Sequence, residues 1–188
     1  MPIIEAHLIE GYDAEAKARL GRALTGAVRQ VVPAAPEAVT VMIREVPQAD
    51  YLRGGQHRQP APPEPDPVAL VRGFLSAMEA RDLDRARSFL AEGFTMHFPG
   101  QPPMHTLEDL VAWSAPRYRS VAKSYDGFDV TATDTAVVVY AFGTLHGEWL
   151  DGTPFSGIRF IDRFEVVAGR FTRQDVWNDM GEVMAAAR

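Results

Sequence analysis

Residues 59–67 read QPAPPEPDP, and five of these nine residues are proline. Proline fixes φ at about −65°, has no N–H to donate and moves the residue before it out of the helical region. The run therefore cannot belong to a helix or a central strand, and it predicts an extended, semi-rigid spacer of about 3.1 Å per residue. We expect two units, residues 1–58 and residues 68–188, joined by this linker.

Charge and size differ on the two sides of the linker. Residues 1–58 contain seven Lys and Arg against seven Asp and Glu, whereas residues 59–188 contain 12 against 18, so the net charge of −6 belongs to the second part. The second part is long enough to bury a core by itself, while the first is marginal alone. We therefore expect a homo-oligomer, from a dimer to a hexamer.

Several classes of protein are disfavoured by composition. The chain has no cysteine, which excludes disulfides and thiolate chemistry. No apolar stretch approaches the ~20 residues of a membrane span, and the first residues do not resemble a signal peptide. A mildly acidic chain argues against nucleic-acid or membrane partners. No spacing typical of a metal site or a phosphate loop occurs, so we expect a cytoplasmic protein without a cofactor or metal.

The first unit has a β-α-β pattern. Residues 2–10 alternate like a strand, Asp13 can cap a helix from Ala14 to Val31, and residues 38–45 (AVTVMIRE) predict a second strand. Two strands joined by a helix of this length are parallel, with a right-handed crossover. One helix covers only one face of the sheet, so the other face needs a partner.

This unit resembles the 4-oxalocrotonate tautomerase family over residues 2–55. The resemblance is carried by Pro2 directly after Met1, by the opening PIIEAHLIEG, by the stretch from Asp13 to Lys17 and by IREVPQADYLRGG. It implies that Met1 is removed and that the Pro2 amine acts as general base, acid or nucleophile. Desolvation of such an amine moves its pKa toward neutrality, where proton transfer is efficient.

The unit also departs from the family at the substrate-binding positions. The resemblance places the two family arginines at Tyr12 and Thr40, neither of which can clamp a carboxylate in a bidentate manner. Tyr51 keeps the aromatic wall of the pocket, and Arg44 is a displaced cation. A dicarboxylate substrate is therefore not expected. Two alternatives stay open: a reactive Pro2 amine, or a platform for oligomerisation in which Pro2 is an ordinary amide.

The second unit has an α+β pattern. We expect helices over residues 67–79, from 82 to about 90 and over 106–119, a short strand over 93–98, and long strands over 125–132, 136–149, 155–167 and 171–180. Thr106 and Asp109 form a capping pattern, and Asp151-Gly152 and Ala168-Gly169 predict hairpin turns. Helices followed by a meander of long strands predict a curved antiparallel sheet that wraps over a helix and encloses a conical cavity.

This pattern resembles the SnoaL-like polyketide cyclases of the nuclear transport factor 2-like superfamily over residues 67–184. The resemblance is carried by FLSAMEARDLDRARSFLAEGFTMHFPG, GTLHGEWLDGTPFSGIRFIDRFEV and GRFTRQDVWNDM. The superfamily also contains ketosteroid isomerase and limonene epoxide hydrolase. Because this fold hosts enzymes and non-enzymes alike, the resemblance predicts the fold more firmly than the function.

Asp162 is the main candidate for a catalytic residue. On the predicted strand it shares one face with four apolar residues, Ile158, Phe160, Phe164 and Val166. A carboxylate in such a row is either paired or neutralised, and desolvation would raise its pKa into a useful range. It is either a catalytic acid or base, or a structural ion pair with Arg159, Arg163 or Arg173.

Other candidates lie on neighbouring elements. Asp179 is the second catalytic candidate, because the triplet Trp177-Asn178-Asp179 resembles the last strand of this superfamily, and Asp175 has the same alternation phase. His97, Tyr118, His146 and Trp177 are candidates for substrate contact. We expect a cofactor-independent isomerase, tautomerase or cyclase that moves protons next to the carbonyl of a small hydrophobic ketone, enone or polyketide-like substrate. The alternatives are epoxide hydrolysis, or a non-catalytic fusion in which the first unit drives oligomerisation and the second binds a hydrophobic ligand.

Overall fold

A computed structural model describes residues 1–186 of the chain. It divides into two compact units, Met1–Pro63 and Glu64–Arg188, so the division falls inside the proline-rich run. Residues 58–66 belong to no helix or strand. None of the helices in the described part of the chain is long and apolar enough to cross a membrane.

The first unit is a β-α-β structure followed by a small hairpin. Strand β1 (Ile3–Ile9) and strand β2 (Thr40–Val46) are parallel, with Ile3 opposite Thr40, and helix α1 (Ala14–Arg29) connects them. The Asp13 carboxylate caps α1 by accepting a hydrogen bond of 2.7 Å from the Ala16 N–H. After two short 3-10 helices (Pro36–Ala38 and Gln48–Asp50), strands β3 (Leu52–Arg53) and β4 (Gln56–His57) pair antiparallel.

The first unit has little core of its own. Within residues 1–63, all of which the structure describes, Ile9 is the one residue that is buried. The sheet face away from α1 exposes Ile3 at 63% and Met42 at 36%. A unit with so little buried apolar surface gains little from the hydrophobic effect, which is the term that normally stabilises a domain.

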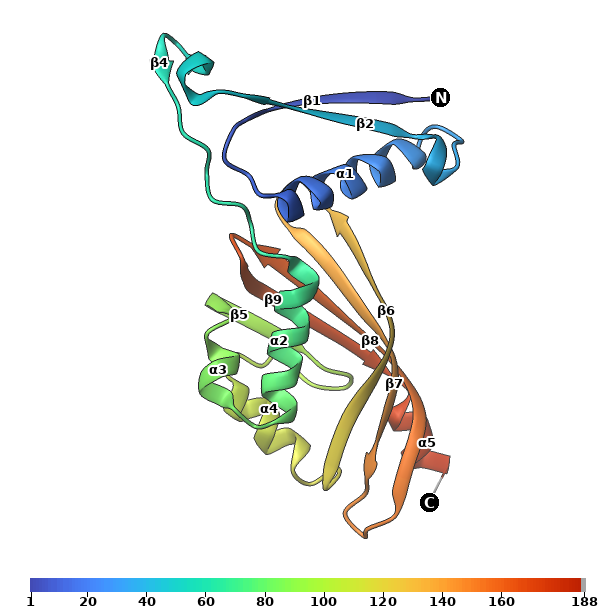
Figure 1. The fold of residues 1–188 in the computed structure, drawn as a ribbon. Coiled ribbons are helices and arrows are strands. Elements are labelled where there is room, and N and C mark those ends of the chain that lie inside the picture. Colours follow the sequence, from blue (N-terminus) through green and yellow to red (C-terminus); the bar gives the residue numbers. More distant parts are fainter. Residues whose placement is uncertain (187–188) are drawn as a thin grey trace. The chain divides into compact units, whose positions relative to one another are not determined.

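The second unit combines short helices with a long sheet (Figure 1). Helix α2 (Pro67–Glu79) begins with Pro67 behind the capping residue Asp66, and it is followed by α3 (Leu83–Arg87) and α4 (Leu107–Ser114). The strands are β5 (Leu90–His97), β6 (Ser120–Ala132), β7 (Val137–Glu148), β8 (Pro154–Val167) and β9 (Arg170–Asn178). Helix α5 (Met180–Ala186) follows β9.

The five strands form one sheet in the order β5-β9-β8-β7-β6. The pairs from β6 to β9 are antiparallel, whereas β5 is parallel to β9. The predicted fold class, an α+β unit with a curved antiparallel sheet after a β-α-β unit, is confirmed.

The core lies between the helices and the inner face of this sheet, by which we mean the face that carries Phe164 and Phe171. Phe74 of α2 packs edge-on against both of these rings, with ring centres 5.8 and 5.3 Å away. A second apolar cluster contains Leu145 of β7, Met180 of α5, and Phe155, Ile158 and Phe160 of β8. Side chains fill much of the predicted conical space, and a cavity of about 560 Å³ lies beside α2 and β6.

Two boundaries differ from the sequence-based prediction in a way that affects the site. Helix α4 ends at Ser114, not at Arg119, because Pro116 has no N–H to donate to a carbonyl of the preceding turn. Tyr118 therefore lies between the helix and β6. Strand β6 begins at Ser120, not at Tyr125, so that Lys123 belongs to the sheet.

Candidate functional site

Asp162 lies in the middle of β8, on the inner face of the sheet. Its exposed fraction is 0%, and its neighbours on that face are Ile158, Phe160, Phe164 and Val166, all of them buried. This is the placement that the alternation of the strand predicts. A carboxylate at such a position needs hydrogen bonds or a counter-charge, because its desolvation is otherwise too costly.

The partner of Asp162 is a lysine from another strand. Lys123 Nζ of β6 donates a hydrogen bond to Asp162 Oδ2, and Gln174 Nε2 of β9 approaches the same oxygen at 3.5 Å. Asp162 Oδ1 and Gln174 Oε1 are also buried, yet neither has a hydrogen-bond partner among residues 1–186. One carboxylate oxygen is therefore held by the protein, and the other keeps its capacity to accept a proton.

The three arginines of the alternative in which Asp162 forms a structural ion pair do not contact it, so the partners named in that alternative are wrong. Arg159 donates to Asp179, Arg163 to Asp175 and Glu165, and Arg173 to Asp175, at distances of 2.5–3.0 Å. Successive residues of a strand point to opposite faces, so Arg159 and Arg163 lie on the face opposite Asp162. That face, which carries Ile161 and Trp177, is called the outer face below.

Lys123 reaches Asp162 along an aromatic surface. Its ammonium nitrogen lies 4.4 Å from the centre of the Phe160 ring, and the Tyr125 ring meets Phe160 edge-on with ring centres 6.0 Å apart. The Lys123 side chain is 21% exposed, against 0% for Asp162. The lysine therefore connects a fully buried carboxylate with the accessible surface.

Tyr125 also belongs to the lining of the cavity of about 560 Å³, together with Arg72, Ser76, Glu79 and Ala80. Burial raises the pKa of the Tyr125 hydroxyl to about 12, and the negative charges of Asp162 and Glu79 act in the same direction. Arg72 stacks over the neighbouring Phe128 ring at 4.1 Å. The cavity thus has one cation, one carboxylate and a protonated phenol at its wall.

Asp179, the second catalytic candidate, and Trp177, a substrate-contact candidate, do not lie beside Asp162. On β9, Val176 pairs with Asp162 on the inner face, so Trp177 points to the outer face, where it is 54% exposed. Asp179, just after the strand, forms an ion pair with Arg159. The single-residue alternation of a strand separates these side chains from Asp162.

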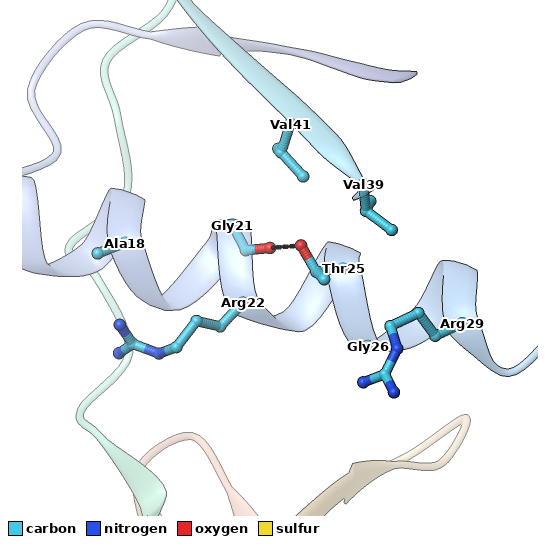
Figure 2. A pocket seen from close by; sticks show the side chains of 8 residues that line it. All are labelled: Ala18, Gly21, Arg22, Thr25, Gly26, Arg29, Val39 and Val41. Carbon is cyan, nitrogen blue, oxygen red and sulfur yellow. Dashed lines mark hydrogen bonds between the residues drawn. The ribbon is translucent and has the colours of Figure 1, made fainter. Parts of the chain in front are cut away.

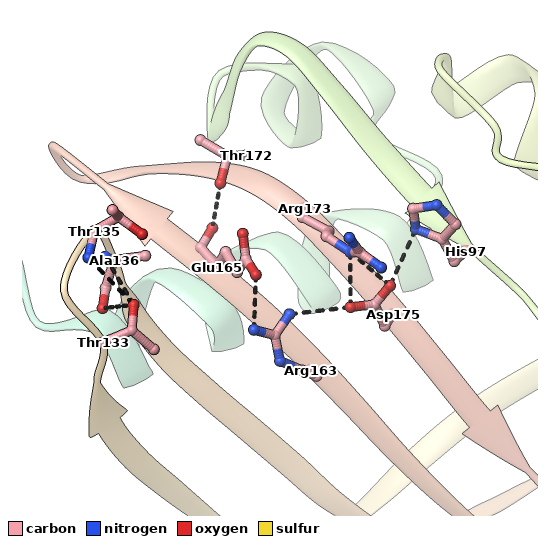
Figure 3. Close-up of polar contacts among 9 residues, drawn as sticks. All are labelled: His97, Thr133, Thr135, Ala136, Arg163, Glu165, Thr172, Arg173 and Asp175. Atoms are coloured by element: carbon pink, nitrogen blue, oxygen red, sulfur yellow. Dashed lines mark hydrogen bonds and ion pairs between the residues drawn. The ribbon is translucent and has the colours of Figure 1, made fainter.

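Asp175 and His97 form an ionic cluster on the outer face (Figure 3). Asp175 is only 5% exposed, and its two oxygens contact Arg163, Arg173 and His97 Nδ1, the last at 3.0 Å. Arg163 also donates to Glu165. With its lone pairs taken by three cationic or polar groups, Asp175 has the contacts of a structural residue.

Tyr118 and His146 lie apart from each other. Tyr118 packs against the second apolar cluster, and burial raises the pKa of its hydroxyl. His146 is exposed on the outer face, with its Nδ1 3.4 Å from Ser124 Oγ. Of the substrate-contact candidates in this unit, Tyr118 is the one on the same side of the sheet as Asp162.

The candidates of the first unit lie at two ends of its strands. The Pro2 carbonyl accepts the Thr40 N–H at 3.0 Å, so these two residues are neighbours at the beginning of β1 and β2. Tyr12 follows the end of β1 and Tyr51 the end of β2. Seven strand residues at about 3.3 Å each separate the two ends by roughly 20 Å. A single copy therefore does not bring Pro2, Tyr12 and Tyr51 together.

Arg44 lies away from Pro2 along the strands, and Pro2 is not part of the lining of this unit's cavity. Arg44 is exposed, and its guanidinium lies 3.9 Å from the Glu5 carboxylate. A cavity of about 420 Å³ runs along α1 and the start of β2 (Figure 2). Its wall is formed by Ala18, Gly21, Arg22, Thr25, Gly26, Arg29, Val39 and Val41, none of which is among the candidates.

Residues 71–174, more than half of the chain, match the family model of the SnoaL-like domain. The chain belongs to the SnoaL-like family. Residues 2–58 match the family model of tautomerase enzymes, so both resemblances seen in the sequence are confirmed. A search among curated proteins finds no significant match.

Solved structures similar to the SnoaL-like unit share its fold at low identity. A nuclear transport factor 2-like protein of unknown function from Burkholderia pseudomallei has a TM-score of 0.54 at 16% identity, over 63% of this chain and 94% of its own. A proposed polyketide cyclase from Xanthomonas campestris has a TM-score of 0.50 at 21% identity, and the match covers 64% of this chain and 96% of the cyclase. A proposed SnoaL-like polyketide cyclase from Jannaschia has a TM-score of 0.51 at 21% identity, and the match covers 69% of this chain and 96% of the cyclase.

Sequence reasoning missed three residues around Asp162 in the SnoaL-like unit, namely Lys123, Gln174 and Tyr125. Gln174 alternates with Val176 on the last strand, which could have placed it on the inner face. Lys123 alternates with Tyr125, but the strand was predicted to begin only at Tyr125. A strand extended back to Ser120 would have put both side chains on one face.

Proposed function

We propose that the SnoaL-like unit is a cofactor-independent isomerase or cyclase that moves a proton on the carbon next to a carbonyl group. Membership in the SnoaL-like family and the match to tautomerase enzymes favour this type of reaction in general. The observation that carries the proposal is the fully buried Asp162, whose Oδ1 is unpaired while Lys123 holds Oδ2.

In this proposal Asp162 Oδ1 removes the α-proton, and the negative charge that develops on the carbonyl oxygen is stabilised by a neighbouring donor. Lys123 supplies a positive charge, and Tyr125 supplies a hydroxyl that stays protonated at neutral pH. Preorganised donors act strongly where water is excluded, because the local dielectric constant is low. The apolar row around Asp162 provides such surroundings.

We propose a small hydrophobic ketone, enone or polyketide-like compound as the substrate. A cavity of about 560 Å³ is of the size that binds small molecules, about 300–1,000 Å³. Two of the similar structures are proposed polyketide cyclases, which agrees with this class of substrate. Epoxide hydrolysis would need a second carboxylate near Asp162. Asp175 and Asp179 lie on the outer face, so Glu79 in the cavity wall would have to fill that role.

Exchange of α-protons tests the proposal without knowledge of the natural substrate. Full-length protein is incubated in D₂O with a panel of small ketones and enones, and loss of the α-proton signal is followed by NMR. We expect exchange by the natural chain, and Asp162→Asn to lower its rate by about 10²–10⁴-fold. Asp129→Asn, the same change at an exposed position of β6, is the control and should leave the rate unchanged. Equal rates for Asp162→Asn and the natural chain would contradict the proposal.

For the tautomerase-like unit we propose a role in assembly, with a reactive Pro2 amine once Met1 is removed. The loss of both family arginines at Tyr12 and Thr40 favours the assembly role, and tautomerase family members are typically oligomeric. Because Pro2 and Tyr51 lie at opposite ends of the strands, a complete pocket requires a second copy of the unit.

Pro2→Ala tests the amine. It should abolish keto–enol tautomerisation by this unit and leave the sedimentation of the protein unchanged. The mass of the purified chain shows whether Met1 is present. Undiminished tautomerisation in the Pro2→Ala variant, or activity in protein that retains Met1, would mean that Pro2 is an ordinary strand residue.

A further inference from the structure

The use of lysine in this chain is unusual. Of its 19 lysine and arginine residues only two are lysines, Lys17 and Lys123. Lys17 lies in α1 and forms an ion pair of 2.8 Å with Glu45, and Lys123 is the partner of the buried Asp162. Every ion pair on the outer face, by contrast, uses arginine or histidine among the described residues.

A structural ion pair needs only a cation, and arginine fills that role elsewhere in this unit. Arginine stays charged in proteins, whereas lysine can give up its proton and then act as a nucleophile. Lys123, on the inner face of the sheet, is the single lysine within residues 64–186. It is therefore the one cationic side chain of the SnoaL-like unit that can become a neutral primary amine.

A proton acceptor for that step lies directly beside Lys123. Its amine lies against the Phe160 ring at 4.4 Å and next to a carboxylate that is fully buried. Transfer of one proton from Nζ to Asp162 produces a neutral amine and a neutral acid, which removes two charges from an apolar place. The Lys123 side chain is 21% exposed, so a substrate can reach it.

We propose that Lys123 forms an imine with the carbonyl group of the substrate, so that the proton transfer of the SnoaL-like unit proceeds through an enamine. This inference rests on the proposed function, because it concerns the same substrate and the same Asp162. It assigns to Lys123 the role of a covalent anchor, and it restricts the substrates to aldehydes and ketones whose carbonyl carbon is open to attack.

The steps balance with a single proton that moves between the two side chains. The neutral Nζ attacks the carbonyl carbon, Asp162 protonates the oxygen, and the nitrogen returns one proton to the Asp162 carboxylate. Asp162 then protonates the hydroxyl group, the C–O bond breaks, and water leaves to give an iminium ion. The Asp162 carboxylate removes the α-proton to form the enamine. Reprotonation at carbon and hydrolysis by water release the product and restore Lys123.

Reductive trapping tests the imine directly. Full-length protein is incubated with 1-phenylpropan-2-one and sodium cyanoborohydride, digested, and mapped by mass spectrometry. We expect the peptide that contains Lys123 to gain the mass of the ketone minus one oxygen atom. The peptide that contains Lys17 is the internal control and should stay unmodified. A label at the N-terminal amine lies on a different peptide and is counted separately.

Two variants complete the test. Lys123→Arg keeps the positive charge beside Asp162 but cannot form an imine, so it should lose both the adduct and the α-proton exchange while its melting temperature stays close to that of the natural chain. Lys17→Arg should change neither the adduct at Lys123 nor the α-proton exchange. Equal labelling of Lys17 and Lys123, or full exchange by Lys123→Arg, would overturn the proposal.

The two proposals fail separately. Exchange that depends on Asp162 without an adduct at Lys123 would overturn the imine and leave the proton-transfer function in place. An adduct at Lys123 without any exchange would support the imine and contradict the proposed proton transfer. Only the adduct distinguishes a covalent role of Lys123 from a purely structural one.

Discussion

The Asp162 carboxylate is held by side chains from two other strands, Lys123 of β6 and Gln174 of β9. Its fully buried position makes the pair sensitive to loss of one member. Removal of a single partner leaves an uncompensated charge inside the protein, whereas replacement of both by apolar residues of similar volume is often neutral or stabilising.

We expect Lys123→Met to lower the free energy of unfolding by about 3–5 kcal/mol, because Asp162 is then buried without a counter-charge. The double variant Lys123→Met with Asp162→Leu should recover most of that loss. Urea unfolding of the natural chain and the variants measures both values. A double variant as unstable as Lys123→Met would show that the charges are not the cause.

Asp162→Asn separates catalysis from architecture in the same experiment. It keeps the shape of the side chain and the hydrogen bond from Lys123, so it should affect exchange of α-protons far more than the melting temperature. A large drop in melting temperature with a proportionate loss of activity would instead make Asp162 an architectural residue.

Tyr125 gives a prediction on pH. Its folded-state pKa of about 12 lies above the ordinary value of 10.0, mainly because of burial. The folded protein therefore holds the proton more tightly than the unfolded chain does. The stabilisation from this group is complete below pH 10.0 and is lost as the pH rises toward 12. Absorption of the phenolate should show one tyrosine that titrates near 12 and is absent from Tyr125→Phe. An unchanged titration in that variant would contradict this.

At the site, the alternation of side chains along one strand was enough to place Asp162 on the inner face. It could not identify the residue that pairs with Asp162. Lys123 belongs to β6, which is separated from β8 by β7, so the contact depends on the sheet order and on a long side chain that crosses Phe160. The same alternation would have excluded Trp177 and Asp179, but only after Val176 had been paired with Asp162. The pairing of strands is a property of the whole sheet.

At the scale of elements, the predictable features were those with a local cause. Asp13, Asp66 and the Thr106–Asp109 capping box begin their helices as expected, because each satisfies free N–H groups of the first turn. Ala168-Gly169 joins two strands, and both residues have the positive φ that such tight turns require. The start of β6 has no such local cause, since residues 120–124 become a strand only through pairing with β7.

Gly143 on β7 shows how the backbone positions the site. The pairing of β6 with β7 shifts register between Tyr125 and Gly127, beside Gly143. A Cβ atom at Gly143 would lie 2.0 Å from the Ser124 carbonyl oxygen, and the φ angle of Gly143 is +156°. This irregularity begins at Tyr125, two residues after Lys123, so it influences how both residues approach Phe160.

We expect Gly143→Ala to lower the free energy of unfolding by about 2–4 kcal/mol, because backbone atoms must move to make room. Gly181→Ala in α5 is the control: nothing lies within 4 Å of its added Cβ, and alanine favours a helix by about 0.5–1 kcal/mol. Urea unfolding of both variants tests the difference. A neutral Gly143→Ala would show that the strand pair adapts without strain.

At the scale of the whole molecule, the two units differ in how they bury apolar surface. The SnoaL-like unit has a continuous core in which Phe74, Phe164 and Phe171 are nearly inaccessible, whereas the tautomerase-like unit buries Ile9 alone among its 63 residues. Hydrophobic burial is the dominant favourable term in folding, so we expect the first unit to bury apolar surface against other copies. The exposed Ile3 and Met42 lie on the sheet face that α1 leaves uncovered.

The two units should therefore behave differently when they are separated. Residues 64–188 as an independent chain should fold, keep a melting temperature close to its value in the full protein and retain the exchange of α-protons.

Residues 1–63 should fold only as oligomers, so their melting temperature should rise with protein concentration, because association stabilises the folded state by mass action. Analytical ultracentrifugation and thermal melts over a range of concentrations measure both properties. The proposed assembly role of the first unit predicts that its removal reduces the size of the oligomer. A full-length chain that sediments as a monomer at micromolar concentration would contradict the assembly role, and it would imply that the first unit gains its stability without further copies.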